Sequence, residues 1–338
     1  MIKNRFQLAL VVSLCLGSLQ AAAKAPVGYD EPNPFAAADI CQMRAEDFLA
    51  KAEHPSNLTS NHNTDGNLGT GLCWWHSKLQ RSALYLTVFD QPDQPKPTRA
   101  EALHILAKLR DLKEVVSVPG FKNWFDFSLA YSHEFYQILN HWEMRDIAQL
   151  QFLKGIRALK ETDQVMLQKI SDEMNDYKRL TFVLLKRPLF DAHSWILQSF
   201  QLEGSDFKAE FIDSNYPAHV NQYESKENVY KIQKHNGFKT DVDPETGIKS
   251  GHYLWPATVD IKAFPEEKGL VYPAGKGPVA MTLYLQNDDV DFQKIASAIQ
   301  SRCGDETPFT LHEKEVVKRK VQKEFERQNW YRPGVPHN

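Results

Sequence analysis

The chain has 338 residues, of which 42% are hydrophobic, 11% aromatic and 25% charged. These proportions are typical of a globular protein with about two domains and exclude a chain that is disordered throughout. The formal net charge is −3, which gives no reason to propose nucleic acid as a partner.

Residues 1–23 have the features of a secretory signal peptide. Lys3 and Arg5 are followed by an apolar run that is too short to span a bilayer comfortably, and the segment ends in small residues. Its removal would change the net charge from −3 to −5. We therefore expect an exported protein, periplasmic or secreted, with no membrane span in the mature chain. An uncleaved anchor is the alternative, and the oligomeric state is left open.

Three cysteines remain after this cleavage, and an oxidising compartment favours disulfides. The economical pairing joins Cys41 to Cys303, which would tie the N-terminal segment to the C-terminal one. Cys73 would then keep its thiol, which an exported protein retains at some risk of oxidation. The alternatives are that Cys73 is a buried apolar residue or itself a disulfide partner.

The predicted elements fall into a helical half and a sheet half. The N-terminal segment, 24–60, becomes helical after a proline-rich start, and a polar loop then leads to a helix that begins at Cys73. Further helical patterns follow from Thr98 to about residue 176. Strands are predicted for residues 179–186, 192–202, 207–213, and around 251–264 and 277–286.

The last predicted element is an amphipathic helix over 314–328, in which Val317, Val321 and Phe325 are spaced four apart. The order of elements predicts an α+β fold, with a helical half packed on an antiparallel sheet half. We assign residues 61–225 to a catalytic domain and 226–338 to a strand-containing extension with a C-terminal helix.

The chemistry centres on Cys73. A thiol reacts as the thiolate, which a helix N-terminus and a nearby histidine both favour. His193 is the best candidate for the base because it stands at the start of a strand, and His252 competes with it. Across the predicted hairpin, Asp213, or else Asn215, would orient the histidine.

Two other residues near Cys73 can be assigned from the sequence. The side chain of Asn67, six residues upstream, could join the backbone N–H of Cys73 in binding an oxyanion. His76 lies three residues after Cys73 on the same helix face, and we interpret it as a packing or surface histidine rather than a second base.

The motifs "NLGTGLCWW", "AHSWIL" and "FIDSNYP" together resemble those of the papain-like cysteine peptidases, in particular bacterial members with a Cys-His-Asp triad. In that family a polar side chain six residues before the nucleophile, a glycine two before it and a tryptophan after it match Asn67, Gly71 and Trp74. Asn67 is shorter than the usual glutamine.

The second half of the resemblance lies on the strands. A histidine that starts a strand and precedes a small residue matches His193 and Ser194, and the orienting residue one hairpin later matches Asp213. The spacings of 120 residues from Cys73 to His193 and 20 from His193 to Asp213 are compatible with the family. The resemblance covers about residues 60–220.

What the resemblance implies is a hydrolase of peptide or amide bonds, with a peptide or protein as substrate and neither a metal nor an organic cofactor. A transglutaminase-like acyltransferase would use the same residue types, although such enzymes usually place the histidine closer to the cysteine. A third possibility is a non-catalytic binding module on the same scaffold, with an inert Cys73. The sequence also leaves open whether 24–60 is a removable pro-segment.

Overall fold

The computed structural model describes residues 33–35, 38–64, 66, 72–148, 163–186, 192–203, 206–214, 216–226, 229–233, 282–285 and 289–330. The helices of these residues are η1 (Ile40–Gln42), α1 (Ala45–Glu53), η2 (Pro55–Asn57), α2 (Cys73–Leu86), α3 (Arg99–Asp111), α4 (Trp124–Ala130), α5 (Ser132–Ala148), α7 (Asp163–Asn175), α8 (Asp289–Cys303) and α9 (Pro308–Trp330). The strands are β1 (Thr87–Val88), β2 (Val116–Ser117), β3 (Thr181–Lys186), β4 (Ala192–Glu203), β5 (Asp206–Asp213), β6 (Tyr216–Lys226), β7 (Val229–Gln233) and β8 (Thr282–Leu285).

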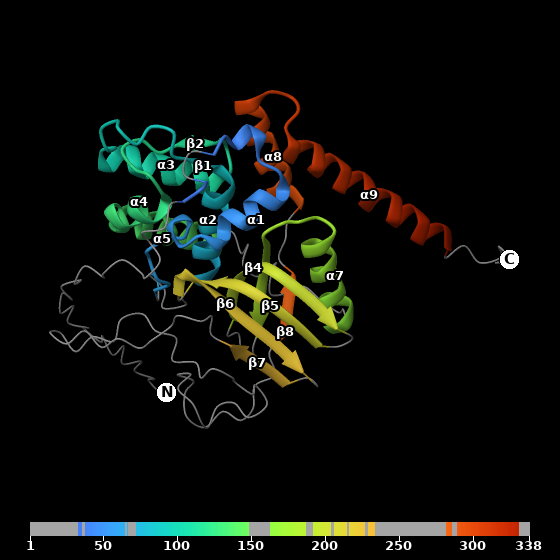
Figure 1. Ribbon diagram of the computed structural model, residues 1–338. Helices are drawn as coiled ribbons and strands as arrows, with labels where there is room; N and C mark the ends of the chain where they lie inside the picture. The colour runs from blue at the N-terminus through green and yellow to red at the C-terminus, as the bar shows by residue number, and fades with distance from the viewer. Residues whose placement is uncertain are drawn as a thin grey trace, which may run out of the picture.

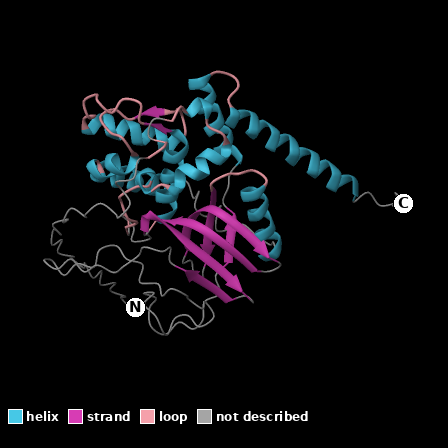
Figure 2. Cartoon of the chain, viewed as in Figure 1, coloured by secondary structure: helices cyan, strands magenta, loops and turns pink. Residues whose placement is uncertain are grey.

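The predicted α+β class is confirmed: most helices gather above an antiparallel sheet, α7 lies beside the sheet and packs on it, and α9 extends outward from the helices (Figures 1 and 2). Within the described residues the sheet has six strands in the order β7-β6-β5-β4-β3-β8, and the short strands β1 and β2 form a separate parallel pair. The predicted signal peptide and the strand expected around 251–264 lie outside the described residues.

Helix α2 is the centre of the helical part. Twelve of its fourteen residues are buried, as expected for a helix covered on all sides. It packs against β4, α1, α3, α5 and α8, and its side chains join one apolar cluster with those of neighbouring elements. Gln80 of α2 binds the segment that follows η2. Its side chain accepts from the Thr59 N–H at 2.6 Å and donates to the carbonyl of Asn57 at 3.1 Å.

The two faces of β4 carry different residues because side chains alternate along a strand. Ser194 and Ile196 belong to the face that meets α2, where Ser194 bonds Ser77 and Ile196 joins the main apolar cluster. Trp195 belongs to the other face, where its ring stacks on that of Phe211 with centroids 3.9 Å apart. Both faces of β4 are thus buried over residues 194–198, the part of the strand that lies beside α2.

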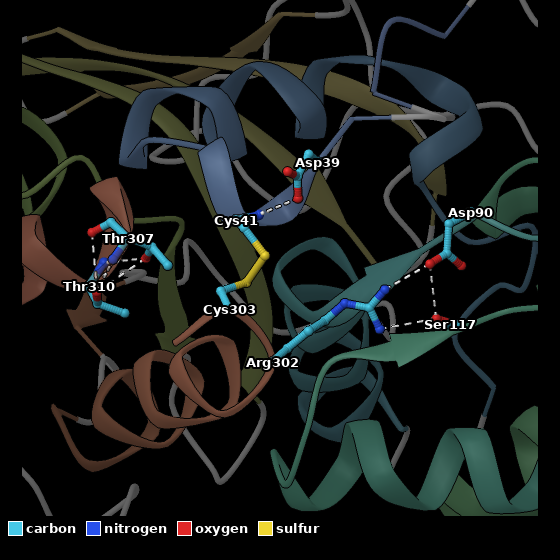
Figure 3. Close-up of a disulfide and its surroundings, with 8 residues drawn as sticks. All are labelled: Asp39, Cys41, Asp90, Ser117, Arg302, Cys303, Thr307 and Thr310. Carbon is cyan, nitrogen blue, oxygen red and sulfur yellow. Dashed lines mark hydrogen bonds and ion pairs between the residues drawn. A yellow bond between two sulfur atoms is a disulfide. The ribbon is translucent and has the colours of Figure 1, made fainter. Parts of the chain in front are cut away.

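The C-terminal segments belong to the same body as the rest of the chain. Strand β8 pairs with β3 in the main sheet, and α8 contributes Phe292 and Ile299 to the cluster around α2. The Cys41–Cys303 disulfide, the pairing expected from the sequence, joins η1 to the end of α8 (Figure 3). The predicted boundary at residue 225 falls inside β6, so the described part of 226–338 forms no separate core.

Several features differ from the sequence expectations. Helix α8 was not predicted, and neither were strands β6 and β7, because the sequences of these strands are polar and β6 carries Pro217. The C-terminal helix is present, but its predicted apolar stripe faces outward: Val317, Val321 and Phe325 are 39%, 65% and 62% exposed. Where the structure describes the chain, it contains no helix with the length and apolar character needed to cross a membrane.

Candidate functional site

Cys73 is the first residue of α2, and it is only 8% exposed. The helix starts there after Leu72, whose backbone N–H donates to the carbonyl of Thr64 at 2.8 Å and so joins the two ends of the preceding loop. The cysteine lies outside the disulfide. The first N–H groups of a helix have no intrahelical partner, and the helix dipole favours an anion beside them. The position therefore suits a reactive thiolate.

Ser194 joins the start of α2 to the start of β4. Its hydroxyl donates to the carbonyl oxygen of Cys73 at 2.6 Å and lies 3.0 Å from the hydroxyl of Ser77, one turn along α2. All three residues are buried, so their polar groups depend on one another rather than on water. These contacts hold the first turn of α2 against β4.

His193 is the second residue of β4 and immediately precedes Ser194. Its backbone is described, in register with Leu185 of β3, whereas its side chain is not. Because Ser194 bonds the backbone of Cys73, the chain around His193 lies beside the first turn of α2. His252, the competing base, lies outside the described residues.

Asp213 is the last residue of β5 and is completely buried. Its register partner is Trp195, two residues beyond His193, and the indole N–H of Trp195 donates to Oδ2 of Asp213 at 2.9 Å. The sequence expectation placed Asp213 directly beside His193. In the structure, the residue directly across the strands from Asp213 is Trp195. A buried carboxylate needs donors, and Trp195 supplies one of them.

A β-bulge decides on which face Asp213 lies. The register of β4 and β5 shifts between Leu197 and Ser199. Without this shift, Asp213 would pair with Ile196 and belong to the face that meets α2. With it, Asp213 shares the face of Trp195. The bulge, which nothing in the sequence reasoning anticipated, is thus a determinant of the site.

Two predicted site residues, Asn67 and the alternative orienting residue Asn215, lie outside the described residues. His76 is described and buried, and its Nε2 bonds the carbonyl oxygen of Asn61 at 2.7 Å. The His76 ring also meets that of Phe135 edge-on at 5.5 Å. His76 therefore packs α2 against the preceding segment and α5, consistent with its interpretation as a packing histidine.

The sequence reasoning assigned no role to α5, yet two of its carboxylates approach the chain on either side of Cys73. The carboxylate of Asp146 accepts from the indole N–H of Trp75 at 3.0 Å. Glu143 is completely buried, and a Cβ added to Gly66 would lie 2.9 Å from its Oε2. The glycine was the only sequence signal for this approach, since a residue without a side chain admits a close neighbour.

A hollow of about 720 Å³ lies along the outer face of α5. Its lining includes Tyr136, whose hydroxyl donates to the carbonyl of His62 at 2.8 Å, and burial raises the pKa of Tyr136 to about 12. Cys73 and Asp213, the predicted triad residues whose side chains the structure describes, are not in its described lining. Through Tyr136 the hollow adjoins the segment before Cys73.

The part of the chain that the structure describes holds no group of three or more His, Cys, Asp or Glu side chains arranged to bind a metal ion. Comparison with protein-family models, with curated proteins and with solved structures finds no match to this chain.

Proposed function

We propose that this chain is an exported cysteine hydrolase of peptide or amide bonds with a papain-like fold, in which Cys73 is the nucleophile and His193 the base. The observation that carries the proposal is the 2.6 Å hydrogen bond from Ser194 to the carbonyl of Cys73. It joins a cysteine at a helix start to the residue that follows His193, across 121 positions of sequence. A catalytic pair that is distant in sequence requires such a connection.

The arrangement of the fold supports this proposal. The cysteine helix is central and packs on an antiparallel sheet, the arrangement that the papain-like resemblance implies. Positions 193 and 213 belong to the same face of the sheet, that of Trp195, because 193 is two residues from Trp195 and Trp195 pairs with Asp213. Since Ser194 meets α2 on the opposite face, the proposal requires His193 to reach Cys73 at the start of β4, where it is the second residue of the strand. Asp213 is the orienting residue in this proposal, and Asn215 is the alternative.

The chemistry proceeds by acyl transfer. His193 accepts the thiol proton, and the Cys73 sulfur forms a bond to the substrate carbonyl carbon. The resulting oxyanion is held by the N–H of Cys73 and the side chain of Asn67. Collapse breaks the C–N bond, the amine leaves with the proton from His193, and a thioester remains. Water, deprotonated by His193, then releases the acid and regenerates the thiol.

The test is the rate of iodoacetamide alkylation of Cys73 against pH, in the chain without residues 1–23. We expect fast alkylation that persists well below pH 8, because a paired thiol remains a thiolate where an ordinary one is protonated. His193→Ala should abolish this behaviour. His312→Ala is the control, since His312 stands on α9 and its ring bonds the backbone carbonyl of Tyr177.

The outcomes separate the alternatives. Slow alkylation with an ordinary thiol profile in both wild type and His193→Ala would overturn the enzyme proposal and leave a binding module. If the thiol is activated, peptide substrates incubated with and without a fluorescent primary amine distinguish hydrolysis from acyl transfer. Asp213→Asn and Asn215→Ala, compared in the same assay, identify the orienting residue.

A further inference from the structure

We propose that Glu143 and Asp146 are positioning residues that fix the chain on both sides of Cys73 and so hold its thiol in the reactive geometry. This inference rests on the proposed function. The two carboxylates are three residues apart on α5, one helical turn, and so lie on neighbouring positions of the same helix face.

Glu143 meets the chain before Cys73. Gly66 has a φ of +66°, and a Cβ at this position would lie 2.9 Å from Oε2 and 3.0 Å from Oε1 of Glu143. It would also lie 2.9 Å from Cδ2 of Leu72, the residue that precedes Cys73. The space beside Gly66, which a Cβ would need, is therefore already occupied by the Glu143 carboxylate and Leu72. Any other residue at position 66 would displace one of them.

Asp146 meets the chain after Cys73. Its Oδ2 accepts from the indole N–H of Trp75 at 3.0 Å, and Trp75 is only 5% exposed. A hydrogen bond to a carboxylate is stronger than one between neutral groups. If the indole rotated away from α5, its buried N–H would lose the Asp146 carboxylate as acceptor, which costs free energy.

The start of α2 needs such external support. Its N-cap, Leu72, makes no side-chain cap hydrogen bond, and the first turn contains no acidic residue. By contrast, α3 begins with a capping box formed by Thr98 and Glu101. An uncapped first turn frays unless other parts of the protein hold it. Asp146 and Ser194 are among the described groups that hold this one, and Glu143, from the same helix as Asp146, lies beside the chain that precedes it.

The experiment compares Glu143→Gln and Asp146→Asn with wild type in the alkylation assay, and monitors thermal unfolding in parallel. Loss of positioning should slow alkylation of Cys73 about tenfold near pH 6.5, because the thiol reverts toward ordinary behaviour. A purely electrostatic role predicts the opposite sign, since removal of a nearby negative charge favours the thiolate. Glu134→Gln is the matched control: Glu134 is also buried on α5, but it pairs with Arg99 at 3.0 Å.

A second set of variants keeps the inference testable if Glu143→Gln does not fold. Trp75→Phe removes the N–H and keeps a smaller aromatic ring, so Trp75→Phe, Asp146→Asn and the double variant should all slow alkylation, with the double variant no slower than Trp75→Phe alone. Unchanged or faster alkylation in all of these variants, with an activated wild type, would overturn the positioning role alone. An ordinary thiol in the wild type would overturn the proposed function and this inference with it.

Discussion

The two ends of α2 are held by different kinds of interaction. In the second half of the helix, the buried guanidinium of Arg81 lies 2.9 Å from Asp291 of α8, and at the helix end Nζ of Lys51 donates to the carbonyl of Thr87 at 3.0 Å. At its start, the contacts are hydrogen bonds: the Ser194 hydroxyl bonds Cys73 and Ser77, and the Asp146 carboxylate accepts from Trp75. The Cys73 thiol occupies the end of the helix where the dipole favours an anion.

The difference indicates that the two halves of α2 have different roles: the second half stabilises the fold, and the first turn carries Cys73. The second half of α2 is anchored by charged groups and aromatic rings, with Arg81 over the rings of Phe182 and Phe292 at 5.6 and 5.3 Å. The first turn is held by hydrogen bonds, each of which contributes less to the free energy of unfolding than the buried ion pair of Arg81. The second half of α2 is thus fixed strongly, whereas the geometry of the first turn depends on a few hydrogen bonds that single substitutions can remove. Three predictions test this contrast.

The largest effect is expected at Arg81. Arg81→Met should lower the free energy of unfolding by about 3–5 kcal/mol, because it removes one member of a buried ion pair. Among the described residues, Asp291, 14% exposed at its side chain, would then keep Lys78 at 3.8 Å as its cationic neighbour. Denaturant unfolding monitored by circular dichroism measures the change.

Arg302→Met is the control for this prediction, since Arg302 is also involved in an ion pair of α8. Its partner, Asp90, lies 2.7 Å away, but the Arg302 side chain is 35% exposed (Figure 3). Its replacement should cost less than about 1 kcal/mol. If Arg81→Met and Arg302→Met lowered the free energy of unfolding equally, the ion pair of Arg81 would not anchor the second half of α2 as proposed.

Part of this arrangement could be predicted from the sequence. The glycine-rich loop followed by apolar positions at helical spacing indicated that α2 begins at Cys73, as it does. The odd number of cysteines after the predicted cleavage indicated one thiol left over, and the economical pairing of Cys41 with Cys303 is present. These inferences rest on local chemistry or on counting, and neither requires knowledge of the tertiary structure.

The remaining features depend on contacts between distant residues. Arg81 and Asp291 are 210 positions apart, and no local pattern links them, so α8 was assigned to an extension instead of the central core. The pairing of Asp213 with Trp195 depends on a bulge that periodicity cannot reveal. The hydrogen bond from Trp75 to α5 is accepted by Asp146, a residue that no sequence motif distinguishes from other acidic residues. Sequence reasoning identified the candidate nucleophile, but the groups around it required the structure.

The second prediction concerns Lys51 and pH. Burial lowers the pKa of Lys51 from 10.5 to about 7. Between these values the unfolded chain binds a proton that the folded protein does not, so this group makes stability rise with pH, by up to about 1.4 kcal/mol per pH unit. Lys51→Met removes the titrating group. The difference in unfolding free energy between wild type and variant should therefore shift in favour of wild type from pH 7 to 9.5.

Lys51→Gln provides a second neutral replacement that still offers a hydrogen bond donor. Both variants should show the same change in pH dependence relative to wild type, because the effect comes from the titration and not from the shape of the side chain. A constant difference across the pH range would mean that Lys51 stays protonated at the end of α2, where it would act as a fixed charge beside the helix dipole.

The smallest effect on stability, and the most informative for the first turn of α2, is expected at Ser194. Ser194→Ala removes the hydroxyl that bonds the carbonyl of Cys73 and should cost about 1 kcal/mol of unfolding free energy. Ser199→Ala is the control on the same strand, since its hydroxyl bonds Glu210 at 3.1 Å. If hydroxyls hold the reactive geometry, only Ser194→Ala should slow alkylation of Cys73 at neutral pH. Equal alkylation in both variants would show that the first turn keeps its position without Ser194, and the contrast between the ends of α2 would then be one of stability alone.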